Sequence, residues 1–209
     1  FQVDHVVELA AEQLIAAPDE FHSADAHAID DGGWMLRVQI EPSRAAPLLD
    51  RARLRLAEGS CGLCGIESLE QVLRPLPQVT ARLDVADTAL FAALAALPDH
   101  QPLGQATRAA HAAAFCAPDG TILAAREDVG RHNAFDKLVG ALARQGLSPA
   151  EGFVVLTARC SYELVQKAVI AGFPLLVTVS AASTMAAERA AAHGLRLYSL
   201  ARGDSLLES

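Results

Sequence analysis

Two cysteines lie three positions apart in a glycine-rich segment, Ser60-Cys61-Gly62-Leu63-Cys64-Gly65. Glycine at positions 59, 62 and 65 opposes a stable helix, so we expect a mobile loop over residues 58–65. A thiolate on such a loop can accept sulfur from one protein and deliver it elsewhere. A second thiol nearby can resolve the persulfide that forms. The pattern is therefore suited to sulfur transfer, with Cys61 and Cys64 as the reacting residues.

Three other chemistries use the same Cys-x-x-Cys spacing. A structural zinc site usually adds a second cysteine pair or a histidine pair, whereas Cys116 and Cys160 are isolated. A thioredoxin-like pair begins a helix in a βαβ unit, which a glycine-rich loop does not resemble. An iron–sulfur cluster needs more cysteines at close spacing. We therefore expect no structural metal, although the spacing alone leaves zinc open.

The densest polar run in the chain is residues 126–137, which leads from an expected strand into an expected helix. His132 and Asp136 are four residues apart, as are Asn133 and Lys137, so each pair shares a face of that helix. Residues at a helix N-terminus are well placed to contact an anion. The alternative is a solvated first turn with an ordinary cap.

Three short segments rich in small, hydroxyl or cationic residues follow three expected strands, at residues 157–161, 180–184 and 200–204. In an open α/β sheet, ligands bind beyond the carboxyl ends of parallel strands. Arg159 and Arg202 are suited to gripping a phosphate with two hydrogen bonds each. On pattern alone, an anion or nucleotide pocket and a set of simple helix caps with solvated arginines are equally supported.

The elements that must position these segments follow from hydrophobic periodicity, glycine and proline. In the first part of the chain, the pattern predicts a helix from Asp4 to before Pro18 and a strand over 34–40. The second part is predicted to begin with a helix capped by Asp87 and a hairpin of residues 112–116 and 121–125. It continues with helices over 130–146, 161–172 and 183–194, which alternate with strands over 153–157, 175–179 and 195–200. Because helices of ordinary length join the last three strands, we expect those strands to be parallel.

The composition narrows the class of protein. The 209 residues are 52% hydrophobic and 20% charged, which is typical of a globular chain with a sizeable core. A formal net charge of -8 disfavours sequence-independent nucleic-acid binding. No apolar run reaches the roughly 18 residues that span a membrane. The four cysteines do not resemble a secreted disulfide framework, so we expect a cytoplasmic protein, and the start at Phe1 suggests a truncated N-terminus.

Four segments carry a resemblance to a known family. Residues 60–65 and 126–137, the segment 163–168 with Gly172 and Pro174 beyond it, and residues 179–181 ahead of Ser183 resemble the FdhD family of formate dehydrogenase accessory sulfurtransferases. The resemblance covers most of residues 58–204, and the twelve-residue block is very specific. One departure is residues 107–111, Thr-Arg-Ala-Ala-His, where the family has Thr-Gly-Gly-x-His.

The resemblance implies a fold and a function. The fold is α/β: a cytidine deaminase-like C-terminal domain over residues 81–209, a mixed sheet with helices on both faces, preceded by a smaller α+β region over residues 1–80. The implied function is a sulfur carrier that takes sulfur from a cysteine desulfurase as a persulfide. It would then sulfurate the molybdenum or tungsten bis-guanine-dinucleotide cofactor of formate dehydrogenase. Binding of a guanine nucleotide such as GDP and assembly as a homodimer are also implied.

The resemblance also implies roles for individual residues. Cys61 would carry the persulfide, with Cys64 as its partner. His111 would transfer a proton or donate a hydrogen bond in the pocket. The residues expected to contact the cofactor are Asp128, Gly130, Arg131, His132, Asn133 and Lys137 on one side, and Ser180, Ser183, Leu200, Ala201, Arg202, Gly203, Asp204 and Ser205 on the other.

Two other functions would use parts of the same pattern. A zinc deaminase needs a glutamate two residues after its histidine and a Pro-Cys-x-x-Cys motif. Here His132 is followed by Asn133 and Ala134, and Cys160 has no second cysteine after it, so three ligands cannot be assembled. The other rival is a chaperone that binds the cofactor or the apo-dehydrogenase without carrying sulfur, and the same pocket would serve it.

Overall fold

The structure is a computed structural model that describes residues 15, 17–28, 34–44 and 75–209. The chain forms two compact units, Phe1–Arg74 and Pro75–Ser209. The first 14 residues and the Cys61–Cys64 loop lie outside the described residues, and so do the predictions made for them. Within the described part of the chain, no helix is long and apolar enough to cross a membrane.

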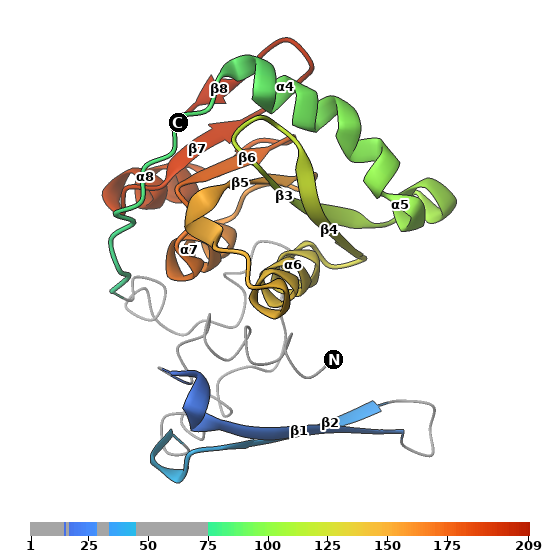
Figure 1. The fold of residues 1–209 in the computed structure, drawn as a ribbon, viewed down its shortest axis with the longest axis vertical. Helices are drawn as coiled ribbons and strands as arrows, with labels where there is room; N and C mark the ends of the chain where they lie inside the picture. Colours follow the sequence, from blue (N-terminus) through green and yellow to red (C-terminus); the bar gives the residue numbers. More distant parts are fainter. Residues whose placement is uncertain (1–14, 16, 29–33, 45–74) are drawn as a thin grey trace. The chain divides into compact units, whose positions relative to one another are not determined.

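The described part of the first unit is an antiparallel hairpin (Figure 1). Strand β1 (Phe21–Ala28) pairs with β2 (Trp34–Ile40), which confirms the strand predicted over 34–40. The short helices η1 (Pro18–Glu20) and η2 (Pro42–Arg44) flank the hairpin. They are joined by an ion pair in which Arg44 Nη2 lies 2.7 Å from Glu20 Oε1.

A six-stranded mixed sheet, in the order β4-β3-β5-β6-β7-β8, forms the centre of the second unit. Strands β5 (Phe153–Leu156), β6 (Leu175–Thr178) and β7 (Arg196–Ser199) are parallel to one another, as predicted. All four residues of β5 and of β6 are buried, which explains their continuous apolar sequence. The remaining strands, β3 (His111–Cys116), β4 (Ile122–Asp128) and β8 (Leu207–Glu208), are antiparallel to their neighbours.

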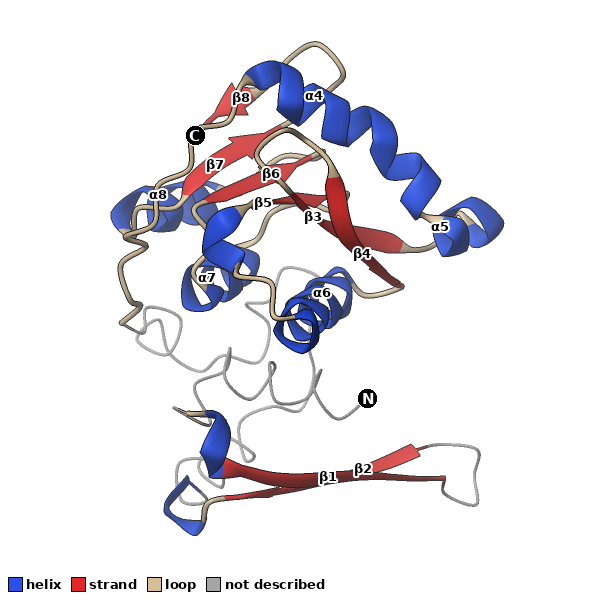
Figure 2. Cartoon of the chain, viewed as in Figure 1, coloured by secondary structure: helices blue, strands red, loops and turns tan. Residues whose placement is uncertain are grey.

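Helices cover both faces of this sheet (Figure 2). One face packs against α6 (Arg131–Gln145), α7 (Tyr162–Ala171) and α8 (Thr184–Ala192), with Phe115, Phe135 and Phe173 in the shared core. The other face packs against α4 (Asp87–Ala96). The remaining helical turns are η3 (Leu97–His100), α5 (Pro102–Thr107) and η4 (Pro149–Glu151). The fold is therefore α/β with a mixed sheet, as expected from the sequence.

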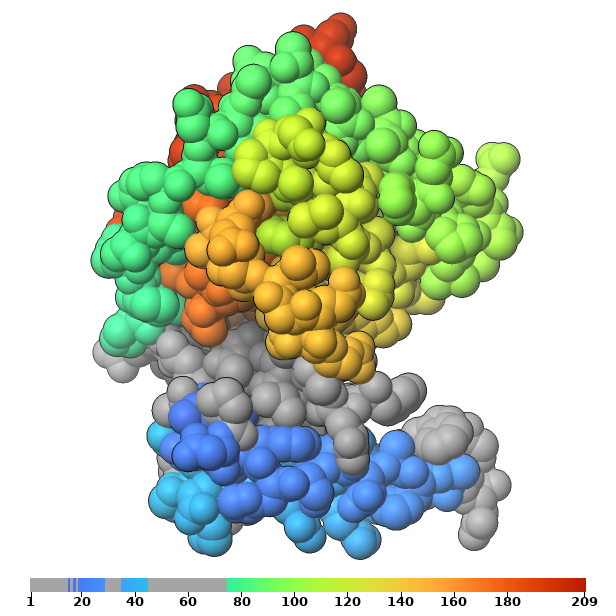
Figure 3. All heavy atoms as spheres, in the orientation of Figure 1, coloured from blue at the N-terminus to red at the C-terminus, as the bar shows by residue number. Residues whose placement is uncertain are grey.

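The extended segment before α4 belongs to the second unit. Val79 is buried, and its N–H donates to the carbonyl of His193 at 2.9 Å. In the space-filling view this segment and α4 form a continuous green surface beside the β3–β4 hairpin (Figure 3).

The helix ends were predicted with mixed success. Gly146 and Gly172 end α6 and α7 in the left-handed conformation, as expected. Ser183 caps α8, with its Oγ accepting from Ala186 N at 3.2 Å. The prediction that Asp87 caps α4 is wrong, because Ala86 occupies the N-cap position and Asp87 is already helical. An acidic residue in the first turn still interacts favourably with the helix dipole.

The tight turn between β3 and β4 packs directly on α4. Gly120 has a φ of 90°, and a Cβ at this position would lie 2.3 Å from the carbonyl oxygen of Ala89. The turn is fixed by Thr121 N, which donates to Asp119 Oδ1 at 2.9 Å, and by Gly120 N, which donates to Ala117 O at 2.9 Å. Glycine is therefore required here for two reasons, its backbone conformation and the close approach of α4.

Gly120→Ala is expected to lower the free energy of unfolding by about 2–4 kcal/mol, because it combines left-handed strain with a backbone clash. The matched control is Gly146→Ala, where φ is 65° but nothing lies within 4 Å of the added Cβ. That control should cost only about 1 kcal/mol. Urea unfolding followed by circular dichroism measures both, and equal losses in the two variants would contradict the packing described here.

Candidate functional site

One edge of the sheet in the second unit gathers most of the residues that the sequence singled out. Parallel strands β5, β6 and β7 all end at this edge. Strand β3 is antiparallel to β5, with Ala113 opposite Leu156, so His111 lies beside the end of β5. His111 is also opposite Asp128, the last residue of β4. Five strand termini therefore meet at the edge where an α/β sheet usually binds ligands, which we call the strand-end site.

The Asp128 carboxylate organises the turn from β4 into α6. Its Oδ1 accepts from Gly130 N at 2.8 Å and from Asn133 Nδ2 at 3.3 Å, and its Oδ2 accepts from Lys137 Nζ. Burial opposes ionisation, but the hydrogen bonds from Lys137 and Gly130 outweigh it and lower the pKa of Asp128. A Cβ on Gly130 would approach Asn133 Nδ2 to 3.2 Å, so a small residue suits this turn.

This network shows what four of the predicted contact residues do within the chain. Asp128, Gly130, Asn133 and Lys137 bond to one another and so fix the direction in which α6 begins. Their direct contact with a cofactor stays a prediction. The turn does place the first residue of α6, Arg131, next to the strand edge.

His111 lies in a positive field at the strand-end site. Burial lowers its pKa, and the charges of Arg131 and Arg159 lower it further. The neighbouring backbone is firmly held, because Ala112 N donates to Thr157 Oγ1 at 2.9 Å and Thr157 N donates to Ala112 O at 3.1 Å. At neutral pH the imidazole is therefore uncharged beside two guanidinium groups, which suits a hydrogen bond to an anionic ligand.

His132 faces the neighbouring helix. Its Nε2 lies 3.2 Å from Glu163 Oε2 on α7. Burial, Arg131 and Lys167 together lower the pKa of His132 to about 4. The imidazole is therefore neutral at pH 7, and Nε2–H donates to the Glu163 carboxylate. Its contact with the cofactor stays a prediction.

One turn further along, a buried ion pair joins the same two helices. Lys167 Nζ lies 2.8 and 2.7 Å from the two Asp136 oxygens. The side chains are only 9% and 10% exposed. A buried charge is costly unless it is paired and hydrogen-bonded, so this pair strongly favours one packing of α6 against α7.

The helix starts at the strand-end site differ in their capping. Ser183 uses its hydroxyl to cap α8, as the capping interpretation of the sequence predicted. Ser161 is at the N-cap of α7 but makes no side-chain cap bond. Its Oγ is buried and has no hydrogen-bond partner among the described residues. Next to the exposed Arg159, this hydroxyl is the kind of group that a bound oxyanion would satisfy.

The segment after β7 is tied to the end of β6. Leu200 has a φ of 52°, a left-handed conformation that is uncommon for this residue type. Its N–H donates to Ser180 O at 3.2 Å, and Arg202 N donates to Ser205 O at 2.9 Å. Arg202 Nη1 donates to the carbonyl of Val179. Arg202 therefore holds the two predicted contact segments together, and one of its nitrogens is already used for that purpose.

The described cysteines are not suited to sulfur chemistry. Cys116 and Cys160 are buried, and burial raises the pKa of each thiol to about 12. Almost no thiolate forms at neutral pH, so neither is a good nucleophile. Within residues 15, 17–28, 34–44 and 75–209, no group of three or more metal-ligating side chains is found. Cys61 and Cys64 lie outside that part of the chain.

Sequence reasoning missed several residues that build the site. Glu163 and Lys167 on α7 contact His132 and Asp136 on α6. The available signal was that the two residues on each helix are four positions apart. Glu127 accepts from the N–H groups of Leu103 and Gly104 at 2.8 and 2.7 Å. It thereby fixes α5, and no local pattern indicates that contact.

Comparison with known proteins settles the family. The model of the FdhD/NarQ family matches residues 9–207. The chain belongs to the FdhD/NarQ family. A relative from Chromobacterium violaceum, named Sulfur carrier protein FdhD, is 46% identical over 180 residues, which is 85% of this chain and 67% of the relative. A relative of the same name from Xanthomonas euvesicatoria is 45% identical over 170 residues, 81% of this chain and 60% of the relative.

The chain therefore spans about 60–67% of the length of these two FdhD relatives. Among solved structures, a formate dehydrogenase accessory protein from Desulfotalea psychrophila matches with a TM-score of 0.68. The match covers 99% of this chain and 74% of that protein, at 18% sequence identity. At that identity the likeness supports a shared fold.

The lowered pKa of His132 predicts that the free energy of unfolding decreases as the pH falls. The unfolded histidine has a pKa of about 6.5, so between pH 6.5 and 4 the unfolded chain binds more protons at this position than the folded one. The stability contributed by the neutral imidazole is fully present above pH 6.5 and is lost as pH falls toward 4. After allowance for partial exposure, the loss over this window is roughly 2 kcal/mol.

Urea unfolding at pH 7.0 and 5.0 measures this effect. His132→Gln should show a smaller decrease in unfolding free energy between the two pH values than the wild type. His100→Gln, which removes an exposed histidine of the same unit, should keep the wild-type decrease. An unchanged decrease in His132→Gln would contradict the neutral, buried imidazole.

Proposed function

We propose that this protein is a sulfur carrier for the maturation of formate dehydrogenase. It takes sulfur from a cysteine desulfurase as a persulfide on Cys61 and delivers it to a molybdenum or tungsten bis-guanine-dinucleotide cofactor. The observation that carries the proposal is 40–46% identity to relatives named Sulfur carrier protein FdhD, together with the Cys61-Gly62-Leu63-Cys64 motif of this chain.

The transfer to Cys61 is an exchange at sulfur. The Cys61 thiolate attacks the outer sulfur of the donor's persulfide, a new S–S bond forms, and the donor cysteine leaves as a thiolate. For delivery, the Cys64 thiolate attacks the inner sulfur of the Cys61 persulfide, so that the outer sulfur leaves as sulfide and a Cys61–Cys64 disulfide forms. Cys116 and Cys160 take no part, because burial keeps both thiols protonated.

The strand-end site is the proposed place for the phosphates and guanine of the client cofactor. Arg131 and Arg159 supply positive charge beside His111, and the unsatisfied Ser161 hydroxyl supplies a donor. Ser180 and the 200–205 segment form the opposite wall. When bound, the cofactor supplies the metal that receives the sulfur as a ligand. The protein's own residues hold phosphate and base in place.

Two further proposals accompany this function. The second unit adopts a cytidine deaminase-like fold; its mixed sheet, in which β3 is antiparallel to the parallel strands β5, β6 and β7, supports this assignment. The protein works in the cytoplasm as a homodimer, with a cysteine desulfurase and formate dehydrogenase as partners. The family to which the chain belongs supports these partners.

Intact-protein mass spectrometry tests the sulfur-carrying step. The chain is incubated with a cysteine desulfurase and L-cysteine without reductant, then measured as wild type, Cys61→Ala and Cys64→Ala. The wild type should gain the mass of one sulfur atom, which dithiothreitol removes. The gain should be absent from Cys61→Ala, and peptide mapping should find no added sulfur on the buried Cys116 or Cys160.

The second candidate is a cofactor-binding chaperone that carries no sulfur. The observation in its favour is that the described residues of the strand-end site, among them His111 and Arg159, all belong to the second unit. Activation of apo-formate dehydrogenase separates the two functions. Loss of activation with Cys61→Ala supports the sulfur carrier. Full activation by Cys61→Ala, with no sulfur on the wild type, would establish the chaperone.

A further inference from the structure

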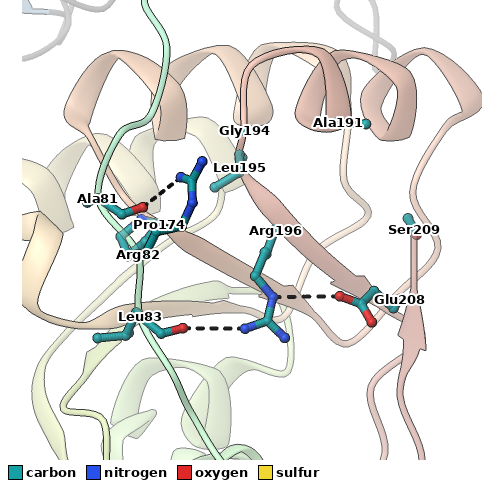
Figure 4. A pocket seen from close by; sticks show the side chains of 10 residues that line it. All are labelled: Ala81, Arg82, Leu83, Pro174, Ala191, Gly194, Leu195, Arg196, Glu208 and Ser209. Atoms are coloured by element: carbon teal, nitrogen blue, oxygen red, sulfur yellow. Dashed lines mark hydrogen bonds and ion pairs between the residues drawn. The ribbon is translucent and has the colours of Figure 1, made fainter.

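A hollow of about 310 Å³ lies at the opposite edge of the sheet from the strand-end site (Figure 4). It lies where β6 and β7 begin, between the extended segment 81–83, the end of α8 and strand β8. Gly194 helps keep it open, because a Cβ there would come within 3.0 Å of Val79 O and 3.8 Å of the Arg82 guanidinium. The volume lies at the lower end of the range of small-molecule sites, about 300–1,000 Å³.

Arg196 forms a rigid part of the wall. Its Nη2 donates to Tyr198 Oη at 2.6 Å, and its Nη1 donates to Leu83 O at 3.3 Å. The guanidinium also lies over the Tyr198 ring, 5.4 Å from its centroid. These contacts hold the charged group in one orientation in the wall of the hollow. Because the Arg196 side chain is already ordered, a ligand that binds beside it does not lose free energy to fixing that side chain.

Glu208 pairs only loosely with Arg196. The distance from Arg196 Nε to Glu208 Oε1 is 3.6 Å, longer than a charge-assisted hydrogen bond, and the Glu208 side chain is 60% exposed. Exposed pairs of this kind contribute little to stability. An incoming anion can therefore replace Glu208 beside Arg196 at small cost.

Arg82 offers an open hydrogen-bonding edge. Both of its bonds come from Nη1, to Val79 O at 2.8 Å and to Ala81 O at 3.0 Å. Nε and Nη2 have no partner among residues 15, 17–28, 34–44 and 75–209. These two nitrogens form the side of the guanidinium that binds both oxygens of a carboxylate at once. Figure 4 shows Arg82 and Arg196 as two of the side chains that line the hollow.

The charges in the wall select the ligand. Among the side chains that line the hollow, Arg82 and Arg196 carry two positive charges and Glu208 carries one negative charge, so these side chains contribute one net positive charge. A single carboxylate neutralises that excess, whereas a doubly charged phosphate would be repelled by Glu208.

We propose that this hollow is a binding site for a carboxylate group, held by the open edge of Arg82 with Arg196 beside it. The site does not rest on the proposed sulfur transfer. A free small carboxylic acid and an acidic side chain of a partner protein present the same chemistry.

Isothermal titration calorimetry on the full chain tests the site with N-acetylglycine, which carries one carboxylate. Its neutral analogue N-acetylglycinamide and inorganic phosphate are the ligand controls. N-acetylglycine should bind with a Kd on the order of 1 mM. The amide should not bind, and phosphate should bind more weakly than the carboxylate.

Three variants make the test specific. Arg82→Gln should weaken carboxylate binding at least about fivefold, since it removes a charge-assisted pair. Glu208→Gln should tighten it about twofold or more, because the competing carboxylate is gone. Arg108→Gln, with the same loss of charge in the turn before β3, should have no effect.

The peptide Ac-Gly-Glu-Gly-NH2, with its glutamine analogue as control, identifies the source of the carboxylate. Tighter binding of the glutamate peptide than of N-acetylglycine supports a partner's acidic side chain, and weaker binding supports a free acid. Phosphate binding better than the carboxylate, or N-acetylglycine binding equally well to Arg82→Gln and wild type, would overturn the proposal.

Discussion

The buried ion pair between Asp136 and Lys167 fixes the geometry on which the strand-end site depends. Both carboxylate oxygens bond to the ammonium group, and neither side chain is more than 10% exposed. Removing Asp136 would leave the buried Lys167 ammonium group without its carboxylate, so α6 and α7 are held in one packing. The same packing places His132 beside Glu163. This contact lies one helical turn nearer than the ion pair to the sheet edge, where α6 begins with Arg131.

The antiparallel direction of β3 then determines which residues lie at this edge of the sheet. Because β3 is antiparallel to β5, the start of the β3–β4 hairpin and its end both arrive where the parallel strands finish. His111, Arg131 and Arg159 consequently share one electrostatic environment, although they are far apart in the sequence. These two arginines form a local positive site on a chain whose net charge is -8. An acidic protein can bind phosphate only where such a local site outweighs the overall charge.

Local signals were sufficient for much of the fold, and long-range pairing accounts for what they missed. Pro118-Asp119-Gly120 and the glycines at 146 and 172 predicted the hairpin and two helix ends, since each requires a particular backbone conformation. The two-residue strand β8 has no signal of its own, because it exists only through pairing with β7. Likewise, the sequence indicated that Arg202 would contact a ligand, but its bond to the Val179 carbonyl depends on how β6 and β7 lie together.

The most direct test of the strand-end site is calorimetric titration of the full chain with GDP at low salt. The wild type should bind, and Arg159→Gln should bind at least about tenfold more weakly, because it removes a guanidinium group that we propose contacts phosphate. Arg108→Gln, which removes an exposed arginine before β3, should bind like the wild type. No binding by the wild type at millimolar GDP, or equal binding by Arg159→Gln, would contradict a nucleotide site at this edge of the sheet.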